Sequence, residues 1–146
     1  MGAGRSSAPY YAEPTTAATV HHTAGSNHYS EAEAPGIVRG IWQYHAVQLG
    51  WGDIGYHALV DKYGNIYEGR AGGMDRGPQG AHVGSFNQNT WGVSMLGDYQ
   101  TAEPTSAALR AMGQALVMIV HRDGEHLLGV LLPDHVIIQH LADLAG

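Results

Sequence analysis

The stretch TVHHTAGSNHYS, Thr19 to Ser30, holds three of the ten histidines of the chain and is the first candidate for chemistry. His21 and His22 are adjacent at the end of the short run AATV, which predicts a β-strand followed by a Gly/Ser/Asn loop. Because successive side chains of a strand point to opposite faces, at most one of the pair can face a given metal ion. The residues alone leave two interpretations open: a zinc ligand, and a hydrogen-bonded histidine at a sheet edge.

His140 has a similar setting, because it follows the apolar run Val136–Gln139, which predicts a last strand. If the two strands are neighbours in the sheet, His21 and His140 can converge on one ion. No HExxH or similar local metal signature supports this.

The other histidines have weaker patterns. His45 and His57 are expected inside a helix and a strand, in structural roles. His82 lies in a Gly-rich loop and is either a binding contact or a loop anchor. The rest are expected to be solvated loop residues: His28, His121, His126 and His135.

Other reactive patterns are few. The chain has no cysteine, which excludes a thiolate ligand or nucleophile. No Gly-x-Ser-x-Gly elbow and no Gly-rich phosphate loop is present. The tripeptide EGR, Glu68–Arg70, places a carboxylate and a cation at a strand end, where an ordinary surface ion pair is the simpler interpretation.

Composition bounds the class of protein. A chain of 146 residues with 44% hydrophobic residues suggests one domain with a single core. The net charge of −6 and the lack of a Lys/Arg run argue against nucleic acid as a partner. No apolar stretch approaches the length of a transmembrane helix, and the N-terminus lacks the apolar region of a signal peptide. Residues 1–15 are expected to form an extended arm, and residues 16–146 the domain.

Local signals predict the elements that position these residues. Ser30 and Glu33 match a capping box, and a helix follows that ends near Gly50. Its apolar positions are Ile37, Ile41, Trp42, Ala46 and Leu49. Tyr56–Val60 and Asn65–Glu68 are expected to be strands joined by a turn around residues 62–64.

A long Gly-rich loop separates this hairpin from a further strand, Trp91–Leu96. Pro104, followed by Thr105 or Ser106, opens a second helix with Leu109, Met112, Leu116 and Val120 on one side. Strands that alternate with helices, with one hairpin among them, predict an α/β fold: a single domain with a central mixed β-sheet flanked by helices.

Four ordered blocks resemble the peptidoglycan recognition protein and type 2 N-acetylmuramoyl-L-alanine amidase family, in the style of its bacterial, actinobacterial-like members. The blocks are VHHTAGSNHYS, GWGDIGYHALVDKYGNIYEGRAGG, GAHVGSFNQNTWGVSMLGDYQ and PTSAALRAM. The resemblance implies a groove across one face of the α/β domain that binds glycan and stem peptide. It also implies one Zn²⁺ at the groove floor in catalytic members, and hydrolysis of the amide between N-acetylmuramic acid and L-alanine.

The resemblance assigns residues block by block. His21, the first histidine of HHT, matches the first zinc ligand, and Tyr56 in DIGYH matches the catalytic tyrosine of amidase members. His82 lies in a block that lines the groove. Further substrate contacts are carried only as candidates: Thr23, Trp51, Arg70 and Asn87.

The family's remaining ligands come from a late block, where this chain departs from the pattern. HRD, His121–Asp123, follows the second predicted helix too early, so the resemblance implies His140 as the second ligand. The third ligand, a Cys or in some members an Asp, would then fall past Gly146. Three residues are left as open substitutes for it: Asp134, His135 and Asp143.

Two functions therefore stand at this point: zinc-dependent amidase, and a non-catalytic protein that binds peptidoglycan or muropeptides with an incomplete zinc site. The amidase is favoured because His21 and Tyr56 are both in place, and a binding protein has less need of that tyrosine. An interaction domain without a glycan role is the distant alternative. The protein is expected to be a monomer. A secreted or cell-envelope location is expected, because peptidoglycan lies outside the cytoplasmic membrane.

Overall fold

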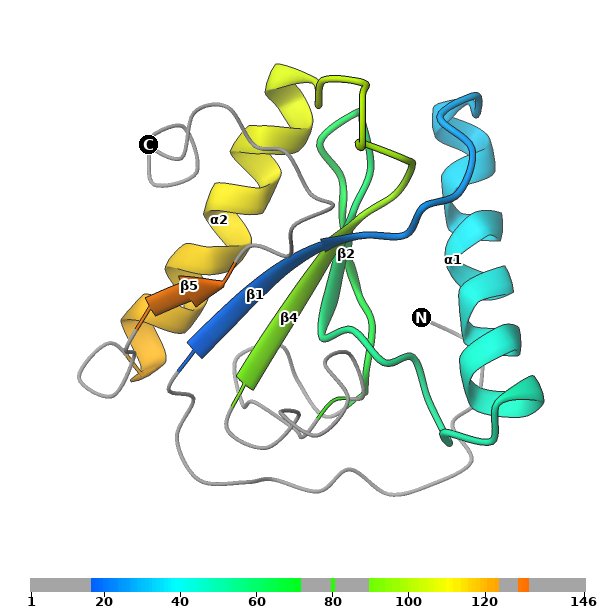
Figure 1. Cartoon of the computed structure of the whole chain (residues 1–146), viewed down its shortest axis with the longest axis horizontal. Helices are drawn as coiled ribbons and strands as arrows, with labels where there is room; N and C mark the ends of the chain where they lie inside the picture. Colours follow the sequence, from blue (N-terminus) through cyan, green and yellow to red (C-terminus); the bar gives the residue numbers. More distant parts are fainter. Residues whose placement is uncertain (1–16, 72–79, 81–89, 124–128, 132–146) are drawn as a thin grey trace.

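The computed structural model describes residues 17–71, 80, 90–123 and 129–131 of the chain. These residues form one mixed sheet in the order β3-β2-β4-β1-β5 (Figure 1). The strands are β1 (Ala17–His22), β2 (Ala58–Val60), β3 (Ile66–Glu68), β4 (Thr90–Met95) and β5 (Gly129–Leu131). β1 is parallel to β4 and β5, β4 is parallel to β2, and β3 is antiparallel to β2. The predicted α/β class with a mixed sheet is confirmed.

Two helical segments lie on opposite sides of the strands (Figure 1). The first begins with the 3₁₀ turn η1 (Glu31–Glu33) and continues through α1 (Ala34–Trp42) into the π-helix η2 (Gln43–Gln48). The second is α2 (Ser106–Asp123). The predicted capping box is present: the Glu33 N–H donates to Ser30 Oγ, and the Ser30 N–H donates to Glu33 Oε1 at 2.8 Å. Gly50 ends the helix with φ +71°, a backbone conformation that suits glycine.

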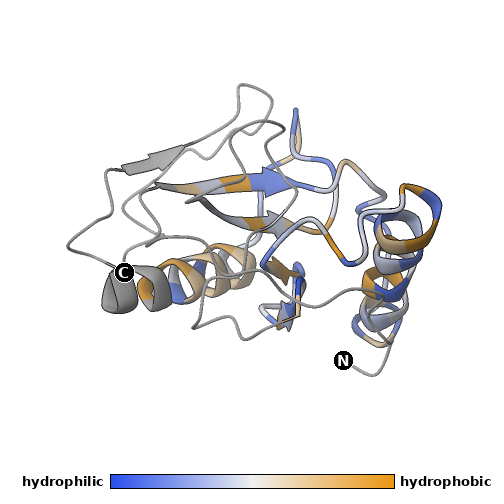
Figure 2. Cartoon of the chain, turned by 90° about the horizontal axis from the view of Figure 1, so that it is seen from below, coloured by the Kyte–Doolittle hydropathy of each residue, from blue (hydrophilic) through white to orange (hydrophobic). Residues whose placement is uncertain are grey.

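Strand alternation gives the sheet two different faces. One face packs against α2 in a core of buried apolar residues that includes Ala18, Val20, Ala58, Val60, Trp91, Val93, Met95, Ala108 and Met112. On the other face, Leu59 and Tyr67 pack with residues of the first helix, among them Ala34 and Val38. Hydrophobic and hydrophilic residues alternate around both helices in Figure 2, as expected for helices that cover a sheet.

The turn between β2 and β3 is held by buried Asp61. Its Oδ1 accepts the N–H groups of Tyr63 and Asn65, both at 2.9 Å, and its Oδ2 accepts the Tyr67 hydroxyl at 2.7 Å. Burial raises the pKa of this carboxyl, but these hydrogen bonds outweigh it, so the pKa lies below its ordinary value. Gly64, with φ +94°, completes the predicted turn.

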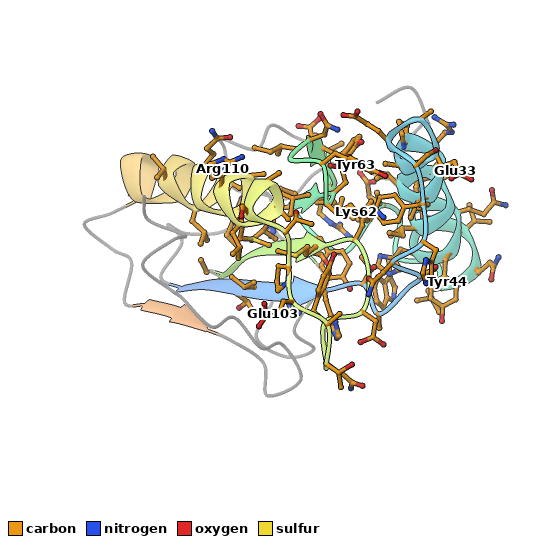
Figure 3. All side chains as sticks on the ribbon, turned by 90° about the horizontal axis from the view of Figure 1, so that it is seen from above. Glu33, Tyr44, Lys62, Tyr63, Glu103 and Arg110 are labelled. Carbon is orange, nitrogen blue, oxygen red and sulfur yellow. The ribbon has the colours of Figure 1, made fainter. Side chains whose placement is uncertain are left out.

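Lys62, in the same turn, ties the hairpin to the loop that follows β1. Its Nζ donates to the Asn27 carbonyl at 2.8 Å and lies 4.8 Å from the centre of the Tyr29 ring. Figure 3 shows Lys62 and Tyr63 in the space between the two helices. The loop after β1 is thereby fixed to the scaffold, which matters because that loop begins after His22, next to His21.

Several predicted boundaries need correction. β2 begins at Ala58, so Tyr56 and His57 precede the strand. His121 is in the last turn of α2, not in a solvated loop, because the helix extends through Asp123. The expected strand at 136–139 lies outside the described residues. The strand that pairs with β1 on the side away from β4 is β5 at 129–131, where no strand was expected.

Candidate active site

The carboxyl ends of three parallel strands, β1, β4 and β2, meet at one edge of the sheet. His21, Ser94 and Leu59 are register partners there, so their side chains share one face. This face is opposite the α2 core. Ligand sites of α/β sheets form outside the carboxyl ends of the strands, so this edge is the candidate site.

His21 and Tyr56 lie against one another at this edge. Their ring centres are 5.4 Å apart, and His21 is only 8% exposed. His22 points to the opposite face, where its Nδ1 accepts the Tyr99 N–H at 2.8 Å. The predicted split of the two histidines between the faces is confirmed, and the side chain left facing Tyr56 is that of His21.

Tyr56 is held in place through its backbone, although it precedes β2. The Arg70 N–H donates to the Tyr56 carbonyl at 2.7 Å, and the Gly69 N–H donates to the His57 carbonyl at 2.9 Å. A Cβ atom at position 69 would collide with the Tyr56 carbonyl oxygen, so residue 69 must be glycine for this approach. Burial raises the pKa of Tyr56, and the nearby Ser94 hydroxyl partly opposes that rise. The phenol therefore keeps its proton at neutral pH.

His45 also belongs to the site, although its position inside a helix predicted a structural role. Its ring centre is 5.6 Å from that of Tyr56 and 4.6 Å from that of Trp51. Its Nδ1 accepts the Gly55 N–H at 3.0 Å, so the neutral ring carries its proton on Nε2. Burial, and then the charge of Arg70, lower the pKa of His45. Helical periodicity could not reveal this, because the loop of residues 51–55 folds back on the helix.

His45 lies in the π-helix η2, which widens the last turns before Gly50. Such turns occur often at functional sites. The residues around His45 are unusually exposed for their type: Tyr44, Val47, Leu49 and Trp51. Figure 3 shows Glu33 at one end of the first helix and Tyr44 toward the other. Trp51 is 42% exposed and its ring lies next to that of His45, so it presents an aromatic surface to solvent beside that histidine.

His45, Trp51 and Arg70 form the wall of the site beside Tyr56, and Arg70 is half-buried there. Its Nε donates to the Ile54 carbonyl at 2.9 Å, and a terminal nitrogen lies 3.5 Å from the Asp53 carbonyl. Burial lowers the pKa of this guanidinium, and Asp53 opposes the shift. The Arg70 side chain is thus anchored on the main chain of the 53–54 segment, whereas the sequence suggested only a surface ion pair with Glu68.

Thr23 serves the loop after β1. Its hydroxyl accepts the Gly97 N–H at 3.0 Å, and its own N–H donates to the Met95 carbonyl at 3.0 Å. These bonds extend the pairing of β1 and β4 beyond the strand ends. Its role as a substrate contact stays a prediction.

The other predicted site residues lie outside the described part of the chain: His82, Asn87, His140 and the substitute ligands Asp134, His135 and Asp143. Within the described residues, no group of three or more His, Cys, Asp or Glu converges as a metal site. Those residues therefore supply one predicted zinc ligand, His21, with a protonated phenol beside it. A catalytic zinc ion normally has three protein ligands, so His21 accounts for one of them.

This mixed sheet between two helices is the α/β architecture of solved peptidoglycan recognition proteins. The structure of Drosophila peptidoglycan recognition protein SA matches with a TM-score of 0.78 and 25% identity, over 93% of this chain and 77% of that one. The ectodomain complex of proteins LCa and LCx, solved with tracheal cytotoxin bound, matches with a TM-score of 0.77 and 26% identity, over 90% of this chain and 78% of that one.

The chain belongs to the N-acetylmuramoyl-L-alanine amidase family, because the model of that family matches residues 11–145. It is 38% identical to peptidoglycan-recognition protein SC2 of Drosophila simulans over 118 residues, which are 81% of this chain and 61% of that protein. It is 37% identical to a human N-acetylmuramoyl-L-alanine amidase over 103 residues, which are 70% of this chain and 16% of that protein. The chain thus spans less than two thirds of the length of these relatives.

Proposed function

We propose that this protein is a zinc-dependent amidase that hydrolyses the bond between N-acetylmuramic acid and L-alanine in peptidoglycan. The observation that carries the proposal is the contact of His21 with Tyr56 at the carboxyl edge of the sheet. Membership of a family described as N-acetylmuramoyl-L-alanine amidase supports the reaction. No helix among the described residues is long and apolar enough to cross a membrane. Because its substrate lies outside the cytoplasmic membrane, the protein acts in a secreted or cell-envelope location.

His21 and His140 are the proposed ligands of the Zn²⁺. When bound, zinc lowers the pKa of a water molecule from 15.7 to about 7 and polarises the scissile carbonyl. Tyr56 keeps its proton and donates a hydrogen bond to the oxygen on which negative charge develops. Burial of the phenol makes this interaction stronger than it would be in water.

The wall beside Tyr56 binds the substrate. His45 presents its Nε2–H as a fixed donor, since its Nδ1 is occupied by the Gly55 N–H. Trp51 adds an exposed apolar ring, and Arg70 adds positive charge near the carboxylates of a stem peptide. A related structure contains tracheal cytotoxin bound to recognition-protein ectodomains, which supports a ligand of the same kind for this site.

The test combines metal content with activity. We expect about one equivalent of zinc per chain, loss of lysis of peptidoglycan after treatment with EDTA, and loss of zinc in His21→Ala. Tyr56→Phe should retain zinc and muropeptide binding while kcat falls by about 10²–10³, the usual effect of losing one oxyanion donor. A protein that binds muropeptides without metal and without hydrolysis would instead establish the non-catalytic binding protein.

A further inference from the structure

Two hydroxyl groups are buried on the face of the sheet that carries His21. Ser94 is fully buried and Thr19 is 2% exposed, and neither side-chain oxygen has a hydrogen-bond partner with good geometry within the described structure. Buried polar groups in native proteins nearly always have a partner, so each such group calls for an explanation.

Ser94 has the more informative position of the two. It is the register partner of His21 on β4, and both side chains face the side on which the Tyr56 ring lies 5.4 Å from the His21 ring. Thr19 lies two residues before His21 on β1, where its register partners are Gly92 and Leu131.

We propose that Ser94 is a positioning residue that holds the Tyr56 phenol beside His21. The Ser94 hydroxyl donates to the phenolic oxygen from the sheet side, which leaves the phenol O–H free to point toward the substrate. A phenol held in this way needs no rearrangement when charge develops on the substrate oxygen. The catalytic meaning of this contact rests on the proposed amidase function, whereas the contact itself does not.

A double-mutant cycle of stability tests the contact without metal or substrate. Unfolding by urea is measured for wild type, Ser94→Ala, Tyr56→Phe and the double variant, each treated with EDTA. We expect the effects on the unfolding equilibrium constant to depart from additivity by about fivefold, the size of one neutral hydrogen bond. Thr19→Val with Tyr56→Phe is the matched control, because it removes the other buried hydroxyl of this face, and it should be additive within about twofold.

The same variants separate positioning from binding. In an active protein, Ser94→Ala should lower kcat about fivefold with KM unchanged, and it should have little further effect when Tyr56 is already Phe. If Ser94→Ala does not unfold cooperatively, Ser94→Cys replaces it, because a thiol of similar size is a weak donor.

An additive stability cycle for Ser94 and Tyr56, or an equal loss of kcat with and without the phenol, would overturn the inference. If wild type is inactive, the proposed amidase function fails while the stability cycle still decides whether Ser94 holds the phenol.

Discussion

Two substitutions of His45 can separate the roles of its two ring nitrogens, Nδ1 as an acceptor and Nε2 as a donor. An asparagine places an oxygen near the position of Nδ1 and can still accept the Gly55 N–H, which lies 3.0 Å from that nitrogen. A glutamine places an amide N–H near the position of Nε2 and can still donate to the substrate. Both variants lose the ring contacts with Trp51 and Tyr56, so the comparison between them cancels that loss.

The two variants should rank in opposite orders in two assays. His45→Asn should be more stable to urea than His45→Gln by about 1 kcal/mol, because only the glutamine variant leaves the part-buried Gly55 N–H without its acceptor. In calorimetry with a muropeptide, His45→Gln should bind about fivefold more tightly than His45→Asn, because only glutamine keeps the donor. If both assays give the same order, His45 has only a structural role and its assignment to the binding wall is refuted.

Three further predictions follow from the scaffold. Gly69→Ala should destabilise the protein by about 1–3 kcal/mol in urea unfolding, because its Cβ would collide with the Tyr56 carbonyl. The control Gly40→Ala, in α1 with no atom near its Cβ, should be neutral or stabilising. Asp61→Ala should cost about 2–4 kcal/mol, since several donors of the β2–β3 turn lose their acceptor. A cost below 1 kcal/mol would contradict that role. Because the folded pKa of His45 is lowered, its stabilising contribution is present above pH 6.5 and is lost as the pH falls through the folded value. Urea titrations of wild type and His45→Asn should therefore diverge above pH 6.5 and converge in acid.

Local sequence signals determined much of the scaffold. The capping box at Ser30 and Glu33 and the stop at Gly50 depend on neighbours within a few residues, and both are present as predicted. The alternation that separates His21 from His22 is equally local, because it follows from the pleat of a single strand. The ordered blocks identified the family, and the match to residues 11–145 confirms it.

Only the tertiary structure decided which distant residues meet at the site. His45 entered the wall because the 51–55 loop returns over the helix, and Ser94 entered because β4 lies beside β1 in a register that pairs it with His21. Tyr56 lies before β2, not within it, and is fixed by hydrogen bonds from the end of β3. Strand order and loop return depend on packing between segments far apart in the chain, which periodicity within one segment cannot encode.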